Sequence, residues 1–208
     1  MNKFLTTRDL YNKYAPQFAD KLDKIPETTQ LDEFIAQLPP QAKVLDVGCG
    51  AGRDSEYLAQ AGLQVTGIDL SENLIAEAKK RRPMLHFQVM DMEQLDFPEA
   101  TFDGVWSKLA IIHIDRANFP AMLQSIWKLL KPGGVLTIET KAGAGEAFEK
   151  VSFQETEERF FVYYELDELI GLLQAAGFVQ VDGYEYSVKN QHATKKKERV
   201  VVFGQKSR

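Results

Sequence analysis

Three glycines at alternate positions follow an early apolar run, and an acid closes the next apolar run. The glycines are Gly48, Gly50 and Gly52, and the acid is the last residue of Gly67-Ile68-Asp69. Because glycine has no Cβ, its backbone can approach a ligand closely and adopt a positive φ. A carboxylate at the end of a strand can accept both hydroxyl groups of a ribose. These residues therefore predict a pocket for an adenosine-containing cofactor.

The spacing of the glycines argues against nicotinamide and flavin dinucleotides. Their fingerprint, G-x-G-x-x-G/A, needs a small sixth residue that lets helix and strand pack closely. Counting from Gly48 the sixth residue is Arg53, and counting from Gly50 it is Ser55. A phosphate-binding P-loop is excluded as well, because no Gly-Lys-Ser/Thr follows the glycines.

Strand-like and helix-like segments alternate along the chain, as in a parallel sheet flanked by helices. The predicted helices cover residues 5–18, 28–38, 52–61, 72–82, 121–131 and 165–176. The predicted strands cover residues 43–47, 64–68, 86–90, 102–107, 135–140, 178–188 and 199–203. Residues 141–164 are a mixed, glycine-rich and aromatic segment, and residues 189–198 form a polar connection. The last two strands are hairpin-like, so we expect a mixed sheet with an antiparallel edge.

Composition predicts one ordinary globular domain. The chain has 208 residues, of which 44% are hydrophobic and 26% are charged, enough to bury a core. Its net charge of -5 gives no general attraction for nucleic acid. The single cysteine, Cys49, has no partnering His that would make it a nucleophile, and no Cys/His cluster has metal-ligand spacing. With neither a signal peptide nor a membrane-spanning run, we expect a cytoplasmic monomer or homodimer without metal.

The turn led by Leu45-Asp46-Val47 resembles motif I of the class I S-adenosylmethionine-dependent methyltransferases, and further motifs follow in order. Residues 67–71 resemble motif II, Met90-Asp91-Met92 the third-strand acidic motif, 103–107 motif IV, and 130–134 the turn before strand five. The resemblance covers about residues 40–140 and is closest in kind to the small-molecule, type 11/25-like methyltransferases.

The resemblance implies an α/β, Rossmann-like, doubly wound fold with a seven-stranded mixed sheet and N-terminal helices. The implied strand order is 3-2-1-4-5-7-6, with the last strand antiparallel. Residues 1–208 would form one domain, with a helical cap over 1–40, a cofactor-binding core over 41–140 and a substrate lid over 141–164.

The same resemblance implies S-adenosylmethionine as the cofactor and S-adenosylhomocysteine as its product. Asp69 would hold the ribose, Asp91 the adenine amino group, and the Met92 amide the adenine ring. Asp46 could hold the cofactor's ammonium, whereas Arg53 either pairs with its carboxylate or is a solvated helix residue. The implied cofactor contacts are Tyr11, Asp46, Gly48, Cys49, Gly50, Gly52, Arg53, Asp69, Leu70, Asp91, Met92 and Ser107.

Residues 11–18 resemble the Y-D-x-x-A-x-x-Y entry segment of small-molecule methyltransferases. Two positions depart from that pattern, because Asn12 replaces the Asp and Phe18 replaces the second Tyr. The resemblance implies that Tyr11 lies near the cofactor and Tyr14 near the acceptor.

Candidate acceptor-side residues follow the fourth and fifth strands. His113, as a neutral imidazole, could remove a proton, or it could hold the loop through backbone hydrogen bonds. Glu139 ends strand five and is a second candidate. Arg159 and Phe160 could build an aromatic pocket with one charged anchor, or they could simply pack the segment. Strand four lacks the Asp/Asn-Pro-Pro-Tyr/Phe motif of amino-methylating DNA enzymes, so we favour a small-molecule acceptor over nucleic acid.

Three function classes remain open from the sequence. The favoured one is a small-molecule methyltransferase acting on an oxygen, nitrogen or carbon. The second is a catalytically silent module that binds S-adenosylmethionine. The third is an NAD-dependent oxidoreductase, which the glycine spacing disfavours.

Overall fold

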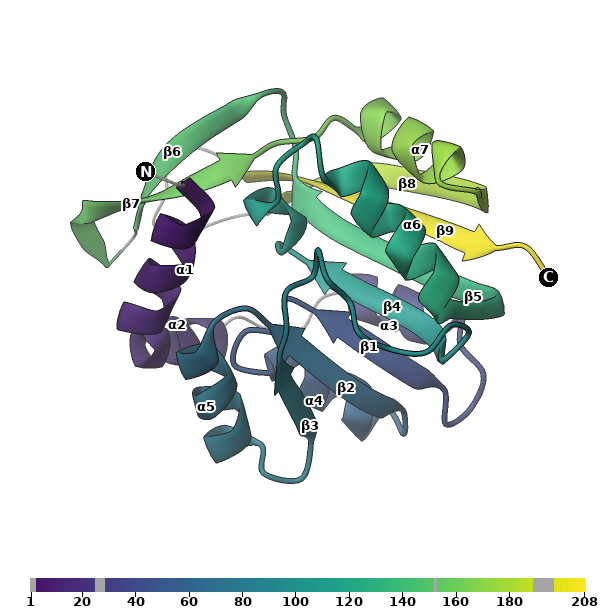
Figure 1. Cartoon of the computed structure of the whole chain (residues 1–208), viewed down its shortest axis with the longest axis horizontal. Coiled ribbons are helices and arrows are strands. Elements are labelled where there is room, and N and C mark those ends of the chain that lie inside the picture. The colour runs from purple at the N-terminus through teal and green to yellow at the C-terminus, as the bar shows by residue number, and fades with distance from the viewer. Residues whose placement is uncertain (1–2, 25–28, 152, 189–196) are drawn as a thin grey trace.

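The computed structural model describes residues 3–24, 29–151, 153–188 and 197–208. Seven strands form one sheet in the order β3-β2-β1-β4-β5-β9-β8 (Figure 1). They are β1 (Lys43–Val47), β2 (Gln64–Asp69), β3 (His86–Val89), β4 (Phe102–Lys108), β5 (Leu130–Lys141), β8 (Phe178–Val188) and β9 (Lys197–Lys206). The labels differ from the predicted numbering because β6 (Glu146–Val151) and β7 (Gln154–Val162) pair in a separate hairpin. Numbered within the large sheet alone, the order is 3-2-1-4-5-7-6, so the predicted order is confirmed.

The sheet reverses its direction of growth between β1 and β4. From β1 the chain adds β2 and β3 on one side, and it then returns to place β4 on the other side. The first five strands are parallel, and β9 runs antiparallel to both β5 and β8. In open α/β sheets, ligands bind beyond the carboxyl ends of the strands at such a reversal.

Helices cover both faces of the sheet. They are α1 (Lys3–Lys13), α2 (Ala15–Leu22), α3 (Thr29–Ile35), α4 (Arg53–Gln60), α5 (Glu72–Arg81), α6 (Phe119–Leu129) and α7 (Leu166–Ala175). In Figure 1, α6 lies in front of the sheet, and α3 and α4 lie behind it. Because successive strand residues point to opposite faces, Leu45 packs in the core under α6 and α7, while Val44 packs with α3 and α4.

The N-terminal segment is two helices rather than the one predicted over residues 5–18. α1 ends at Lys13 and α2 begins at Ala15, with Tyr14 between them at φ -117°. Pro16 in the first turn of α2 explains the break, because proline suits a helix start and disfavours helix before it.

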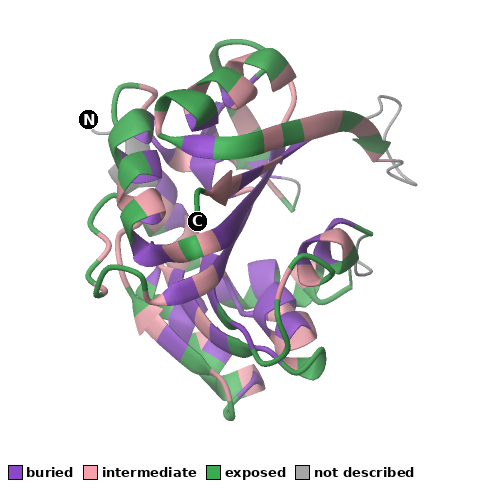
Figure 2. Cartoon of the chain, turned by 90° about the vertical axis from the view of Figure 1, so that its right-hand side faces the viewer, coloured by how far each residue is buried: buried purple, intermediate pink, exposed green. Residues whose placement is uncertain are grey.

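Residues 141–164 contain the hairpin β6–β7, which the sequence did not predict. The short helix η1 (Ile111–His113) after β4 was not predicted either. The prediction for 189–198 lies largely outside the described residues, as does the predicted helix start at residue 28. Figure 2 shows that buried residues concentrate on the central strands, whereas most of the edge strand β8 is exposed or half-buried.

Candidate functional site

The glycine turn after β1 is tied to the end of β2. The amides of Gly48 and Cys49 both donate to the Ile68 carbonyl, at 2.8 and 2.9 Å. Gly48, Gly50 and Gly52 have φ values of 72°, 56° and 87°, in the left-handed region that favours glycine. Space forbids a side chain at two of these positions, because a Cβ would lie 2.3 Å from Ala110 Cβ at Gly48 and 2.5 Å from Phe87 Cζ at Gly52. At Gly50 a Cβ would meet only Leu22, at 3.8 Å.

Asp69, at the end of β2, holds the same turn with its carboxylate. Its Oδ2 accepts from the Gly50 amide at 2.9 Å, and its Oδ1 accepts from the Ser71 amide at 2.8 Å. Burial raises the pKa of Asp69, and these backbone donors oppose that effect. Since each carboxylate oxygen has two lone pairs, both oxygens keep capacity to accept from ligand hydroxyls.

Asp46 lies behind the glycine turn as a buried acid. It is 2% exposed, and its Oδ2 accepts from Ser55 Oγ at 2.5 Å. Burial raises the pKa of Asp46 to about 7, and the like charge of Asp54 is the next cause. Arg53 is not free in this arrangement, because its guanidinium pairs with Asp54, which also accepts from Trp106 Nε1 at 3.1 Å.

The remaining cofactor candidates lie around this turn. Burial raises the pKa of the Cys49 thiol well above its usual value, which gives no support for a nucleophile. Asp91 Oδ1 accepts from the Glu93 amide at 2.9 Å, so this carboxylate is fixed just after β3. Met92 Cε lies 3.9 Å from the position that a Gly48 Cβ would occupy. Leu70 is half-buried after Asp69, and Ser107 is buried near the end of β4.

A hydrogen-bonded chain joins α1, η1 and β7 on the acceptor side. Arg159 Nη1 donates to the Tyr11 hydroxyl at 2.7 Å, and that hydroxyl lies 3.0 Å from His113 Nε2. His113 Nδ1 lies 3.0 Å from the Phe160 carbonyl oxygen. Because a carbonyl only accepts, Nδ1 carries the proton, and Nε2 accepts from Tyr11. Burial, and then the charge of Arg159, lower the pKa of His113 to about 3, so the imidazole is neutral.

Two predicted acceptor-side side chains point elsewhere. The Tyr14 hydroxyl donates to Glu157 on β7 at 3.3 Å, apart from the Tyr11–His113 pair. The Phe160 ring is buried in the main core, so its contribution to the acceptor side is its backbone carbonyl. This position agrees with the alternative that Phe160 packs the segment, and a pocket-lining role for its ring stays a prediction.

Glu139 and Arg159, two other predicted acceptor-side residues, are held by contacts of different kinds. Glu139 is 1% exposed, and its Oε2 lies 3.0 Å from Lys108 Nζ at the end of β4. Arg159 is half-buried, with its guanidinium 5.5 Å from the Tyr11 ring centroid and 5.0 Å from that of Phe161.

Sequence reasoning missed two tethers of the site. Asn12 Oδ1 accepts from Ser71 Oγ at 2.7 Å, which ties α1 to the start of α5. Arg82 donates to the Ala51 carbonyl at 3.0 Å and to Asp23 at 2.8 Å, joining the glycine turn to the end of α2. In the sequence, the only sign of the first tether was that Asn12 replaces the Asp of the family's entry segment. For the second no local signal exists, because its partners lie far apart in the sequence.

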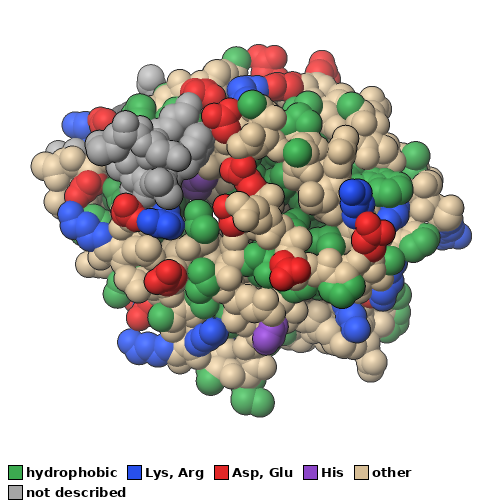
Figure 3. Space-filling model, viewed as in Figure 1, with side chains coloured by type: hydrophobic (Ala, Val, Ile, Leu, Met, Phe, Trp, Pro, Cys, Tyr) green, Lys and Arg blue, Asp and Glu red, His purple; other side chains and the backbone are tan. Residues whose placement is uncertain are grey.

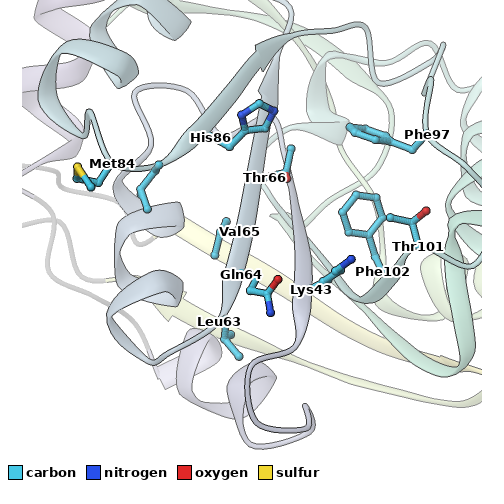
Figure 4. A pocket seen from close by; sticks show the side chains of 11 residues that line it. Lys43, Leu63, Gln64, Val65, Thr66, Met84, His86, Phe97, Thr101 and Phe102 are labelled. Atoms are coloured by element: carbon cyan, nitrogen blue, oxygen red, sulfur yellow. The ribbon is translucent and has the colours of Figure 1, made fainter.

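A shallow pocket lies at the end of the strands opposite to the glycine turn. It has a volume of about 440 Å³ and is lined by residues that begin β1 to β4, including Lys43, Gln64, His86 and Phe102 (Figure 4). This is the amino end of the strands, away from the glycine turn. Among the described residues, no group of His, Cys, Asp and Glu is placed to hold a metal ion.

Surface charge and helix length bear on two further kinds of partner, polyanions and membranes. Figure 3 shows acidic and basic side chains interspersed over the face that it displays. No helix in the described part of the chain is both long and apolar enough to cross a bilayer.

Comparison with known proteins identifies similar chains. The family model described as "Methyltransferase domain" matches residues 44–134. A malonyl-[acyl-carrier protein] O-methyltransferase of Enterobacter lignolyticus is 39% identical over 113 residues, 53% of this chain and 44% of that protein. A phosphoethanolamine N-methyltransferase of Triticum aestivum is 35% identical over 161 residues, 74% of this chain and 31% of that protein. The chain thus spans less than half the length of these curated relatives.

A solved structure is similar over nearly the whole chain. It is a 1,6-didemethyltoxoflavin-N1-methyltransferase of Burkholderia thailandensis, with bound 1,6-didemethyltoxoflavin and S-adenosylhomocysteine. Its TM-score is 0.73 at 25% sequence identity, and the match covers 98% of this chain and 88% of that one.

Proposed function

Because the chain belongs to the class I S-adenosylmethionine-dependent methyltransferases, we propose that it transfers the methyl group of S-adenosylmethionine to a small-molecule acceptor. Two of the similar proteins are named for small acceptors, phosphoethanolamine and 1,6-didemethyltoxoflavin, which supports that class.

The observation that carries the proposal is the hydrogen bonding between the Asp69 carboxylate and the glycine turn. The carboxylate is fixed by the Gly50 and Ser71 amides, at 2.9 and 2.8 Å, and keeps lone pairs for two ribose hydroxyls. Gly50 combines a positive φ with room at its missing side chain, where a Cβ would meet only Leu22 at 3.8 Å, which suits close approach of a ligand. Asp46, two residues before Gly48, provides a carboxylate for the cofactor's ammonium.

When bound, S-adenosylmethionine supplies an electrophilic sulfonium methyl, so the protein's main task is positioning. Tyr11 donates toward His113 Nε2 and accepts from Arg159, which fixes the hydroxyl between the cofactor residues and the acceptor side. With a pKa of about 3, His113 is a weak base, and we assign it the role of positioning Tyr11 rather than removing a proton.

We also propose that α1 and the hairpin β6–β7 close over the acceptor as a lid. The two elements contact each other, and Tyr11 on α1 bonds Arg159 on β7. Closure of this kind excludes water from the reacting groups.

Turnover with a panel of small acceptors tests the proposed function. S-adenosylhomocysteine and methylated product would be measured together by mass spectrometry, with Asp69→Asn as the matched variant that loses turnover. Binding of S-adenosylhomocysteine with no methylated product from any acceptor would favour the silent cofactor-binding module instead.

A further inference from the structure

Cationic side chains outnumber carboxylates where β4 and β5 end. The cations come from β4, β5, β7 and β9, and they are Lys108, Lys141, Arg159 and Arg199. The carboxylates come from β5 and β6, and they are Glu139 and Glu149. Both carboxylates have a lysine partner: Lys108 Nζ lies 3.0 Å from Glu139, and Lys141 pairs with Glu149. Arg199 shares Glu139, at 4.0 Å, and Arg159 lies opposite Glu149 in the β6–β7 ladder, so neither arginine has a carboxylate to itself.

Arg199 is buried with part of its guanidinium unpaired. The residue is 9% exposed, and its Nε lies 4.0 Å from Glu139 Oε1, at the limit of an ion pair. Within the described part of the chain, its Nη1 is buried and has no hydrogen-bond partner. The neighbouring Tyr186, directly opposite on β8, lies close to Glu139, which raises the pKa of its hydroxyl after burial as the largest cause. A buried cation in this state is costly unless something else supplies the missing acceptor.

Arg159 is similarly incomplete. Within residues 3–24, 29–151, 153–188 and 197–208, Arg159 forms no ion pair, and its buried Nε has no hydrogen-bond partner. The contacts it does make are to the Tyr11 hydroxyl and to the rings of Tyr11, Phe18 and Phe161. Those rings hold the guanidinium in place without neutralising it.

The two arginines flank Lys141. Arg199 lies directly opposite Lys141 in the β5–β9 ladder, an arrangement that is destabilising for like charges. Lys141 Nζ lies 3.6 Å from the Phe161 ring centroid, and the Arg159 guanidinium lies 5.0 Å from the same centroid. Burial lowers the pKa of Lys141 to about 8, and the charges of Arg199 and Arg159 add to that lowering.

This cluster adjoins the proposed cofactor residues. Tyr11, which bonds Arg159, is close enough to Asp69 for that carboxylate to contribute to its raised pKa, after burial as the largest cause. Lys108 ends β4, which lies next to β1 and its glycine turn. A group held by the arginines would thus sit on the acceptor side of the cofactor.

We propose that Arg159 and Arg199 form an anion-binding subsite, and that the methyl acceptor carries a compact oxyanion, either a carboxylate or a phosphate. This inference rests on the proposed function, since it names the class of acceptor for the same site. The guanidinium fork matches both oxyanions through paired N–H donors. Arg159 Nε and Arg199 Nη1 are the unpaired donors that the oxyanion would satisfy.

The test is calorimetry on the full chain saturated with S-adenosylhomocysteine, titrated with inorganic phosphate or with acetate at constant ionic strength. We expect at least one of the two anions to bind with a stoichiometry of one, and the arm that binds identifies the oxyanion. Arg199→Gln and Arg159→Gln should each weaken that binding at least about tenfold, because each removes a charge-assisted hydrogen bond. Arg199→Lys, which keeps the charge, should recover part of the affinity.

Lys128→Gln is the matched control, because it removes one exposed positive charge from α6. It should leave anion binding unchanged. S-adenosylhomocysteine binding by Arg199→Gln shows that this variant is folded, and it separates the two claims. If the parent binds S-adenosylhomocysteine but neither anion, or if the arginine variants bind the anion as the parent does, the subsite is refuted while the proposed function stands. Failure of the parent to bind S-adenosylhomocysteine would instead refute the proposed function.

Discussion

Asp69 holds the glycine turn in place and is also the proposed ribose ligand. Its carboxylate accepts from the Gly50 and Ser71 amides, so it shapes the turn that it would help to fill. We expect Asp69→Ala to weaken S-adenosylhomocysteine binding by at least about tenfold, since unpaired buried groups cost about 1–3 kcal/mol each. Calorimetry measures this, with the exposed acid Asp96 changed to Asn as the control.

The same variant should also unfold at a lower temperature, because two backbone donors lose their acceptor. Affinity equal to that of the parent would show that Asp69 only starts the helix α5.

Asp46 predicts a pH dependence of cofactor binding. Its pKa of about 7 means that the free protein holds it protonated below neutrality, with Asp54, Ser55, Arg53 and Asp69 as the groups facing it. An ammonium favours the ionised form, so binding must remove the proton at low pH. We expect the affinity for S-adenosylhomocysteine to rise by up to about tenfold per pH unit between pH 5 and 7.

Asp46→Asn should flatten that dependence, because the amide cannot ionise but still accepts from Ser55. The variant should also gain stability relative to the parent as the pH rises from about 4 to 7. Over that window a raised carboxyl pKa lowers the parent's stability, because the folded state binds more protons than the unfolded one. An equal pH slope in both proteins would assign the titration to another group.

At the scale of elements, one glycine of the glycine turn and one glycine that follows α4 offer a matched pair of substitutions. Gly52 and Gly62 have nearly equal φ values of 87° and 86°, but only Gly52 is crowded, with a Cβ position 2.5 Å from Phe87. Gly62→Ala should cost about 1–2 kcal/mol from the left-handed backbone alone. Gly52→Ala should cost a further 1–3 kcal/mol, approximately, from overpacking. Denaturant unfolding measures both, and equal costs would contradict the packing argument.

Closure of α1 and the hairpin β6–β7 predicts a change in amide hydrogen exchange. Both elements should become more protected when S-adenosylhomocysteine binds, because Tyr11 connects Arg159 on β7 to the neighbourhood of Asp69. The helix α6, which packs in the core, should exchange equally in both states. Unchanged exchange in α1 and the hairpin at saturating ligand would leave them as static packing.

The sequence could predict the main sheet but not the hairpin. Runs such as 43–47 and 64–68 are apolar, bounded by turn signals and matched by β1 and β2, so local pattern was sufficient there. The hairpin β6–β7 mixes charged residues with aromatics: most of β6 is exposed, whereas the consecutive Phe160 and Phe161 on β7 are both buried. Neither a helical nor a strand period stands out in such a segment, and its strands pair with each other rather than with the large sheet.

Part of the candidate site could likewise be predicted from the sequence, and part of it could not. The glycine turn and Asp69 are signalled by residues close together in the sequence, and the structure places them side by side. The Arg159–Tyr11–His113 chain joins residues that are 148 and 102 positions apart, so no local pattern could show it. For Phe160 the sequence left open whether the ring lines a pocket or packs the segment, and in the structure the ring lies in the main core.

At the scale of the whole molecule, the topology and the charges point to one kind of partner. The strand order reverses between β1 and β4, and in open α/β sheets a ligand binds beyond the carboxyl ends of the strands at such a reversal. The net charge of -5 and the interspersed surface charges favour a small ligand over a polyanion.

The most direct test of the central claim is calorimetry of the full chain with S-adenosylhomocysteine and, separately, with NAD. The account predicts one binding site for S-adenosylhomocysteine and no measurable heat with NAD, because the sixth residue of the fingerprint, counted from Gly48 as the first, is Arg53 rather than a small residue. Tight binding of NAD, with no heat from S-adenosylhomocysteine, would contradict it.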